Sequence, residues 1–258
     1  EEGETAVVAS IAELSYKYKD WYTAIEYFEK LLIDNPIAEN YFKLSVASAR
    51  KSLEVSRFFS VPYVMKARKS VFKAHKMEPK KVVIFNLLIQ LYAEIPTLLG
   101  GSIAFAEQKA EELKNIDSIS AKMMQAYLFG VKNNLDASKS KYAEIFKDLN
   151  QQFPSQREWI KELDRDMVFE LGRAASEYNI ESEVGKAAFE LYIDAYGFKD
   201  NYPLEWAYYY QSRIYDFNQQ SEKTQVSLQK ALEINPNFEE ARELLLSLIH
   251  ISEPTRPL

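Results

Sequence analysis

Apolar and small residues recur along the chain with one spacing, and this spacing predicts a series of amphipathic helices. In each copy three such residues stand at offsets 0, 4 and 7, and in the clearest copies a proline follows at offset 12. The first three offsets fall on one face of a helix with about 3.6 residues per turn, so they form a packing stripe. The proline cannot continue the helix but suits the start of the next one. The four clearest copies are Ala24-Phe28-Leu31-Pro36, Ala67-Val71-Ala74-Pro79, Tyr142-Phe146-Leu149-Pro154 and Thr224-Leu228-Ala231-Pro236, and two weaker copies are Ala106-Ala110-Leu113-Ser118 and Ala188-Tyr192-Ala195-Asp200.

Small residues upstream of several of these stripes indicate a partner helix before them. Ala12, Gly130 and Ser212 each stand 12 residues before a stripe begins, and Gly172 stands 16 residues before its own. A glycine in the middle of a helix costs about 1 kcal/mol relative to alanine. We expect Gly130 and Gly172 to offset this cost by allowing a neighbouring helix to approach closely.

The repeated unit is therefore a helical hairpin, and the fold class is all-α. The surplus length relative to a compact hairpin falls at 57–62 and at 95–102, which we expect to be loops between paired helices. A last helix from Asn237 would cap the stack. The predicted pairs are 5–19 with 21–34, 38–58 with 63–77, 80–95 with 102–115, 119–132 with 137–152, 157–178 with 183–196, and 204–217 with 221–234.

Two segments carry a family resemblance. The run from Trp21 to Leu32 and the run from Lys230 to Asn237 resemble the second helix of a tetratricopeptide repeat, and Tyr92 and Tyr215 occupy the aromatic position of the first helix. The resemblance extends over roughly residues 5–249 and implies a right-handed α-solenoid of about six antiparallel helix pairs. The units run from 36 to 43 residues, longer than the family repeat of about 34, so a HEAT-like solenoid remains the architectural alternative.

The chain shows no linker rich in proline, serine or glycine, so we expect one domain over residues 1–249. Residues 250–258 have no periodicity and resemble a translated sequencing adapter of the kind found in metagenome-derived reading frames. We expect this tail to be non-native or disordered, and the native chain to continue past about Ser247. A natural disordered C-terminus is the alternative.

Composition excludes several classes of function. The 258 residues include no cysteine and two histidines, and the net charge is −6. Without cysteine there is no disulfide and no Cys-ligated metal, and two histidines leave little room for a histidine metal site or a catalytic triad. An acidic chain argues against a dedicated nucleic-acid binder. No run of 18 apolar residues occurs, so we expect no membrane span. We also expect no metal and no cofactor.

Catalytic motifs are missing from the sequence. The glycine and hydroxyl of a phosphate loop are absent around Gly185-Lys186-Ala187. Asp164 and Asp166 point to different faces of a helix, and we expect them to be solvated. We expect His75 to be an exposed residue at a helix end, and 100–102 to be a turn with positive φ followed by a serine N-cap. The chain is thus not predicted to be an enzyme.

The resemblance implies a binding surface, because the first helices of tetratricopeptide repeats line a concave face that contacts peptides. The mixture of amide, aromatic and cationic side chains at these positions suits an extended peptide. We therefore expect a non-enzymatic scaffold for a protein or peptide partner. The predicted peptide-binding residues are Lys43, Arg50, Asn86, Gln90, Tyr127, Phe169, Arg173, Tyr209 and Arg213, and the same positions include Asn40, Asn134 and Asp216.

The densest aromatic cluster is 206–210, and it leaves other functions open. We expect Tyr208 and Tyr215 in the core stripe, Tyr209 on the concave face and Tyr210 on the flank. A small-molecule or carbohydrate platform is one alternative function, and a helical part of a longer enzyme or envelope-assembly protein is another. The absence of cysteine suits an exported bacterial protein and equally a cytoplasmic one.

Overall fold

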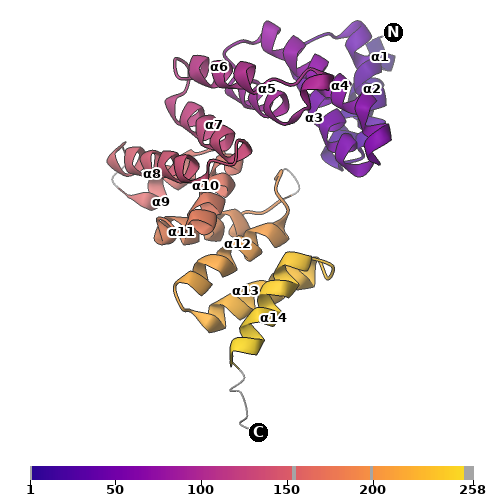
Figure 1. Ribbon diagram of the computed structural model, residues 1–258. Helices are drawn as coiled ribbons and strands as arrows, with labels where there is room; N and C mark the ends of the chain where they lie inside the picture. Colours follow the sequence, from indigo (N-terminus) through magenta and orange to yellow (C-terminus); the bar gives the residue numbers. More distant parts are fainter. Residues whose placement is uncertain (1, 153–154, 198–199, 253–258) are drawn as a thin grey trace. The chain divides into compact units, whose positions relative to one another are not determined.

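The computed structural model describes residues 2–152, 155–197 and 200–252, and this part of the chain is helical with no strand (Figure 1). It divides into two compact units, residues 1–141 and 142–258, with the division inside helix α8 (Leu135–Gln152). The prediction of one continuous domain over 1–249 stays a prediction, and the two units are described separately.

The N-terminal unit is built from helix pairs that pack in sequence order. Each helix packs against the next because a short connection brings the following apolar face back onto it. The helices are α1 (Glu2–Lys17), α2 (Trp21–Asp34), α3 (Ala38–Glu54), α4 (Arg57–Met77), α5 (Val82–Glu94), the 3-10 turn η1 (Thr97–Leu99), α6 (Ile103–Leu113), α7 (Ser118–Val131) and the first turns of α8.

The C-terminal unit repeats this arrangement, with the largest contacts between α10 and α11 and between α12 and α13. Aromatic rings fill its core, where Phe169, Phe189 and Tyr210 pack against one another. Beyond the second half of α8, its helices are α9 (Gln156–Glu162), α10 (Arg165–Tyr178), α11 (Ser182–Asp194), α12 (Leu204–Phe217), α13 (Ser221–Ile234) and α14 (Glu239–Ser252).

The predicted packing stripes form the core. Every residue at offsets 0, 4 and 7 of the six copies is at most 3% exposed, with the exception of Ala195, which is exposed beyond the end of α11. Pro36, Pro79 and Pro236 each lie two residues beyond the last helical residue, as the spacing predicts. Pro154 lies outside the described residues. The apolar spacing therefore locates both the buried face and the end of each second helix.

Two predicted helix boundaries are wrong. The helix expected over 157–178 is divided into α9 and α10, because the Asp164 side chain caps α10 and accepts a hydrogen bond from the backbone N–H of Asp166 at 2.9 Å. The loop expected at 57–62 is helical, and Pro62 lies inside α4. A proline in the second turn removes a single backbone hydrogen bond, and α4 continues past it. The helix α14 also runs through residues 250–252, which we expected to be part of the tail.

The two glycines expected at close contacts have different surroundings. A Cβ atom at Gly172 would lie 2.9 Å from the Phe189 ring, which confirms a close approach there. A Cβ atom at Gly130 would meet nothing within 4 Å, so that expectation is wrong. The close contact between α7 and α8 lies one turn earlier, where the Ser138 hydroxyl donates to the backbone oxygen of Ala126 at 2.9 Å.

Glycine-to-alanine substitutions should therefore have opposite effects at these two sites. Gly130→Ala should raise the free energy of unfolding by up to about 1 kcal/mol, because alanine favours the helix and no atom obstructs its methyl group. Gly172→Ala should lower it by about 1 kcal/mol net, because overpacking against the buried Phe189 outweighs the helix preference. Urea denaturation followed by circular dichroism measures both. Equal effects of the same sign would contradict the placement of the close contact.

Candidate functional site

The first helices of the N-terminal unit are joined by polar side chains. Lys43 on α3 lies 2.8 Å from a carboxylate oxygen of Glu13 on α1 and 3.1 Å from Glu39. Glu39 in turn lies 3.3 Å from Lys81, which precedes α5. Burial lowers the pKa of Lys43, but the hydrogen bonds from Glu13 and Glu39 outweigh it, so the net effect raises that pKa. These pairs join α1, α3 and the start of α5.

The same side of α5 and α7 continues this row. Tyr127 on α7 donates a hydrogen bond from its hydroxyl to Glu94 at the end of α5. Asn86, Gln90 and Glu94 follow one another at intervals of four residues and so share one side of α5. On α3, Arg50 lies two turns after Lys43 and shares its side. We call this row the first-helix face, formed by Glu13, Glu39, Lys43, Arg50, Asn86, Gln90, Glu94 and Tyr127.

Three predicted residues on the first-helix face are not engaged by other side chains. Arg50 is exposed and Gln90 is half-buried, and neither forms a hydrogen bond or ion pair with any residue that the structure describes. The Oδ1 atom of Asn86 is buried and accepts no hydrogen bond within the described chain. By contrast, Asn40 is buried and donates to the backbone oxygen of Asn35, where it holds the end of α2. Arg50, Asn86 and Gln90 are thus the predicted residues on the first-helix face that other side chains leave unengaged.

Two predicted residues of the C-terminal unit are held inside it. Phe169 is 2% exposed and stacks on Tyr202 with ring centroids 4.2 Å apart, so it belongs to the core rather than to a surface. The Arg173 guanidinium binds Glu170 at 3.0 Å and Glu177 at 2.6 Å. Burial opposes its charge, but the two carboxylates raise the pKa of Arg173 overall. Its donors are already used within α10.

The aromatic side chains of α12 have other orientations than the sequence predicted. Tyr210 is buried with Ala207 and Ile214, so the main core stripe of α12 runs through these residues. Tyr208 is half-buried and packs against the cluster of Leu228 and Ala231, and Tyr215 is half-buried. The apolar pattern of α12 is compatible with two orientations of the helix that differ by one residue, which is about 100° around the helix axis. Tyr209 packs against Trp206 and Phe238 and is half-buried.

Tyr208 and Tyr215 instead line a groove of about 530 Å³ between α11, α12 and α13. Lys230 lies over the Tyr208 ring and Lys223 over the Tyr215 ring. Arg213 lies 5.9 Å from the Phe217 ring and forms no ion pair with a described residue. Acidic and basic side chains are mixed in the groove, so its charge does not select one class of ligand.

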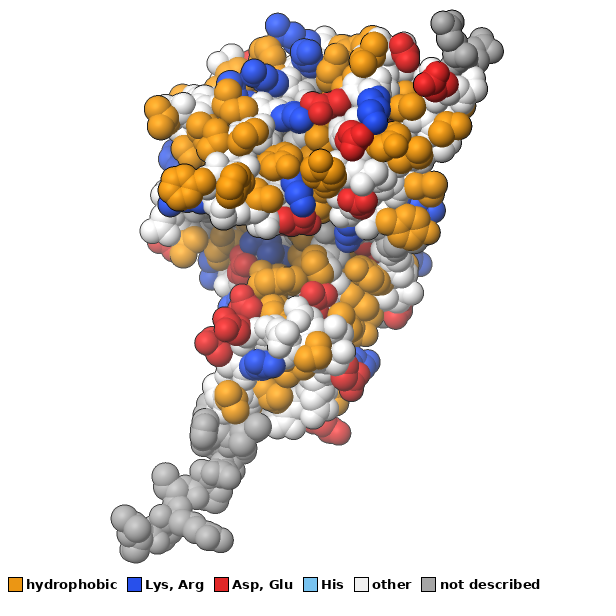
Figure 2. Space-filling model, turned by 90° about the vertical axis from the view of Figure 1, so that its right-hand side faces the viewer, with side chains coloured by type: hydrophobic (Ala, Val, Ile, Leu, Met, Phe, Trp, Pro, Cys, Tyr) orange, Lys and Arg blue, Asp and Glu red, His pale blue; other side chains and the backbone are white. Residues whose placement is uncertain are grey.

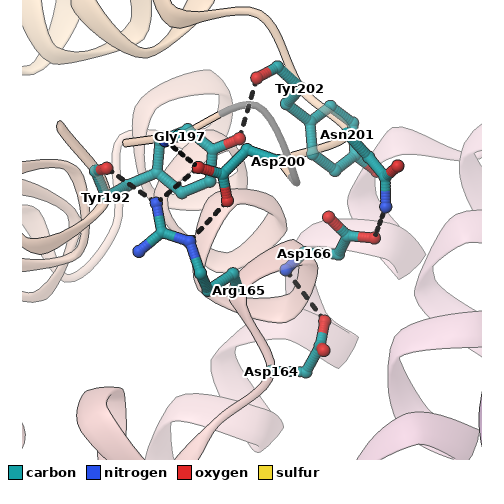
Figure 3. A network of polar contacts seen from close by, with 8 residues as sticks. All are labelled: Asp164, Arg165, Asp166, Tyr192, Gly197, Asp200, Asn201 and Tyr202. Atoms are coloured by element: carbon teal, nitrogen blue, oxygen red, sulfur yellow. Dashed lines mark hydrogen bonds and ion pairs between the residues drawn. The ribbon is translucent and has the colours of Figure 1, made fainter. Parts of the chain in front are cut away.

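A polar network holds the connection before α12 against the start of α10 (Figure 3). The Arg165 guanidinium donates to both carboxylate oxygens of Asp200, at 3.0 Å for Oδ2, and to the backbone oxygen of Tyr192 at 2.8 Å. Asp200 is 5% exposed and also accepts from the backbone N–H of Gly197 at 2.7 Å. Asn201 donates to Asp166 at 2.6 Å. Every member has partners within the chain, so the network positions the loop and is not an acid–base pair.

The remaining sequence candidates have structural roles. Gly100 has a φ of 88° and the Ser102 side chain caps α6, which confirms the predicted turn. The expectation for His75 is wrong: its side chain is buried and lies edge-on to Phe85 at 4.5 Å, because α5 packs against this end of α4. Burial, and then the charge of Lys109, lower the pKa of His75.

The described residues contain neither a metal-ligand cluster nor a membrane-spanning helix. No group of three or more histidines or carboxylates in the described chain is placed to hold a metal ion. Among the same residues, no helix has the length and apolar content needed to cross a bilayer. 

Comparison with known proteins identifies the architecture. A chain from the crystal structure of the APC/C hetero-tetramer Cut9–Hcn1 matches 96% of this chain and 47% of its own length, with a TM-score of 0.58 and 12% identity. A tetratricopeptide repeat protein from Parabacteroides merdae matches 95% of this chain and 98% of its own, with a TM-score of 0.43 and 14% identity. The C-terminal part of a TPR repeat-containing protein from Cytophaga hutchinsonii matches 94% and 88%, with a TM-score of 0.41 and 16% identity.

The match to the Cut9–Hcn1 chain, with its TM-score of 0.58, confirms the predicted all-α solenoid fold. This chain spans about half the length of the Cut9–Hcn1 chain that it matches. No protein-family model matches the sequence. No curated protein matches it either.

Removing Arg165 should destabilise the C-terminal unit. Arg165→Leu would leave the buried Asp200 carboxylate without its cation, and we expect a loss of about 2–4 kcal/mol in the free energy of unfolding. The control is Glu183→Ala, which removes an exposed ion pair with Lys186 and should cost less than about 0.5 kcal/mol. Urea denaturation compares them, and similar losses for both variants would contradict the role of Asp200.

His75 should make the N-terminal unit less stable at mildly acidic pH. Its pKa is lowered in the folded state, so the unfolded chain binds more protons, and stability falls as the pH drops through about 6.5. In His75→Leu the free energy of unfolding should change less between about pH 7.5 and 5.5 than in the wild type. Parallel pH profiles for the two proteins would contradict this prediction.

Proposed function

We propose that this protein is a non-enzymatic scaffold that binds a polypeptide partner, and that the first-helix face of the N-terminal unit is a binding surface. The observation that carries the proposal is the row of polar contacts Glu13–Lys43, Glu39–Lys81 and Glu94–Tyr127. These contacts align the first helices, and on that aligned side Arg50 and Gln90 have unused hydrogen-bonding groups.

The chemistry of this face suits an extended peptide. The Gln90 amide can donate to and accept from a peptide backbone, and Asn86 one turn away has an oxygen without a donor. Arg50 offers a planar guanidinium that can bind a carboxylate through two parallel hydrogen bonds. Lys43 is already neutralised by two carboxylates, so we expect it to orient the face rather than to supply affinity.

The solved structures support a protein partner by analogy of fold. The chain with a TM-score of 0.58 belongs to a hetero-tetramer of two different proteins, Cut9 and Hcn1. Stacked helical repeats present equivalent residues of successive units side by side, which gives one surface several points of contact with a chain. In the C-terminal unit, Arg213 is the predicted residue whose guanidinium is not paired with a carboxylate in the described chain.

Site-specific photo-crosslinking tests this proposal. A benzophenone amino acid at Val46, between Lys43 and Arg50 on the same side of α3, should form covalent adducts with a partner protein in lysate. Combining it with Arg50→Ala and Gln90→Ala should lower the adduct yield at least tenfold, which corresponds to about 1.4 kcal/mol of lost binding.

The control places the same probe at the exposed Lys139 on α8, where we expect no specific adduct. Circular dichroism establishes that each variant is folded. Adducts of equal yield at both positions, or adducts that are unaffected by the two substitutions, would move the site away from the first-helix face.

A further inference from the structure

The helix α4 has an unusual distribution of charge. Its 21 residues contain six lysines and arginines and no aspartate or glutamate, whereas the other 237 residues carry 26 basic and 38 acidic side chains. The protein as a whole is therefore acidic, but this helix is strongly basic. Like charges one turn apart on a helix lower its stability by about 0.2–0.5 kcal/mol per pair.

The lysines of α4 form a single stripe on the side away from the core. Ala67, Val71 and Ala74 are fully buried on one side of the helix. Lys66, Lys69, Lys73 and Lys76 follow one another at intervals of three and four residues, so they share another side. Lys69, Lys73 and Lys76 are exposed.

Most of this stripe lacks carboxylate partners. Lys66 pairs with Glu29 on α2 at 2.6 Å. Lys73 lies over the Tyr41 ring at 5.0 Å and Lys76 over the Phe72 ring at 4.7 Å, and in the described chain no carboxylate pairs with Lys69, Lys73 or Lys76. Three positive charges of the stripe are thus not neutralised by the described chain.

A groove with an apolar floor lies beside the stripe. It has a volume of about 480 Å³ and is formed by α2, α3 and α4. Ile33 is 79% exposed at its edge, and Leu32, Pro62 and Met65 also line it. Lys66, Lys69 and Lys73 line the same groove, with Glu29 as its one acidic residue among those described. Figure 2 shows hydrophobic side chains mixed with basic and acidic ones on one face of the N-terminal unit.

We propose that this α4 groove binds an acidic polypeptide segment that carries apolar side chains. Carboxylates of the partner would pair with Lys69 and Lys73, and its apolar side chains would cover Leu32, Ile33 and Met65. The apolar floor favours a polypeptide over a nucleic acid, because a phosphate backbone has no apolar groups to bury there. The Tyr41 ring, which could stack on a base, is already covered by Lys73. The surface is distinct from the first-helix face, so it is a second docking site.

Selection from a display library of random 12-residue peptides tests the proposal. Peptides that are enriched on the wild-type protein and are retained in the presence of an excess of a soluble Lys69→Glu, Lys73→Glu variant should be rich in aspartate and glutamate and contain large apolar residues. In fluorescence anisotropy the dissociation constant of such a peptide should rise at least tenfold in this variant. It should also rise with added salt, because exposed charges are screened.

Matched controls separate this site from the first-helix face and from other ligands. A Lys139→Glu, Lys147→Glu variant changes the same charge on α8 and should bind as the wild type does, and so should Arg50→Ala, Gln90→Ala. The neutral variant Lys69→Gln, Lys73→Gln should show an intermediate loss, and circular dichroism checks its fold.

Three outcomes would overturn the proposal. Enriched peptides that are neutral or basic would exclude an acidic partner, and binding that is equal in the α4 and α8 variants would exclude the groove. Tighter binding of a 20-nucleotide single-stranded RNA or of phosphatidylserine vesicles than of the peptides, lost in the α4 variant, would assign the stripe to a different class of ligand.

Discussion

Close packing between helices of a pair is the constraint on which the rest of this structure depends. The first residue of most packing stripes is alanine or threonine, and Ala24, Ala67, Ala106 and Thr224 are fully buried. A larger side chain there would push the paired helices apart and open gaps that lose dispersion contacts. Because a single helical hairpin cannot bury both of its faces, each hairpin also depends on the next one.

Close packing limits the residue types on one side of each helix, whereas the opposite side can carry other residue types. In α4 the inner side consists of small apolar residues, whereas the outer side consists of lysines beside a groove with an apolar floor. The lysine stripe could have been found in the sequence, since residues 57–77 contain no aspartate or glutamate. The resemblance to tetratricopeptide repeats points to the first helices, whereas this charged surface lies on a second helix.

The polar residues of the first helices show that neighbouring side chains decide whether a cation is available to a ligand. Lys43, Arg50 and Arg173 are all cations predicted to bind a peptide, but carboxylates hold Lys43 and Arg173, and Arg50 has no such partner in the described chain. Their partners come from α1 for Lys43 and from the adjacent turns of α10 for Arg173. The spacing of Glu170 and Glu177 around Arg173 already predicts that pairing from the sequence, whereas the pairing of Lys43 with Glu13 on another helix is seen only in the structure.

The sequence by itself determined the helical class, the repeat type and the buried stripe, because apolar periodicity and proline positions act within one or two helices. The tertiary structure decided which residues face outward. Phe169 and Tyr210 are buried, His75 packs against Phe85 of α5, and Gly130 has open space beside it. A rotation of about 100° about a helix axis corresponds to one residue in sequence, and only contact with neighbouring helices selects among such rotations.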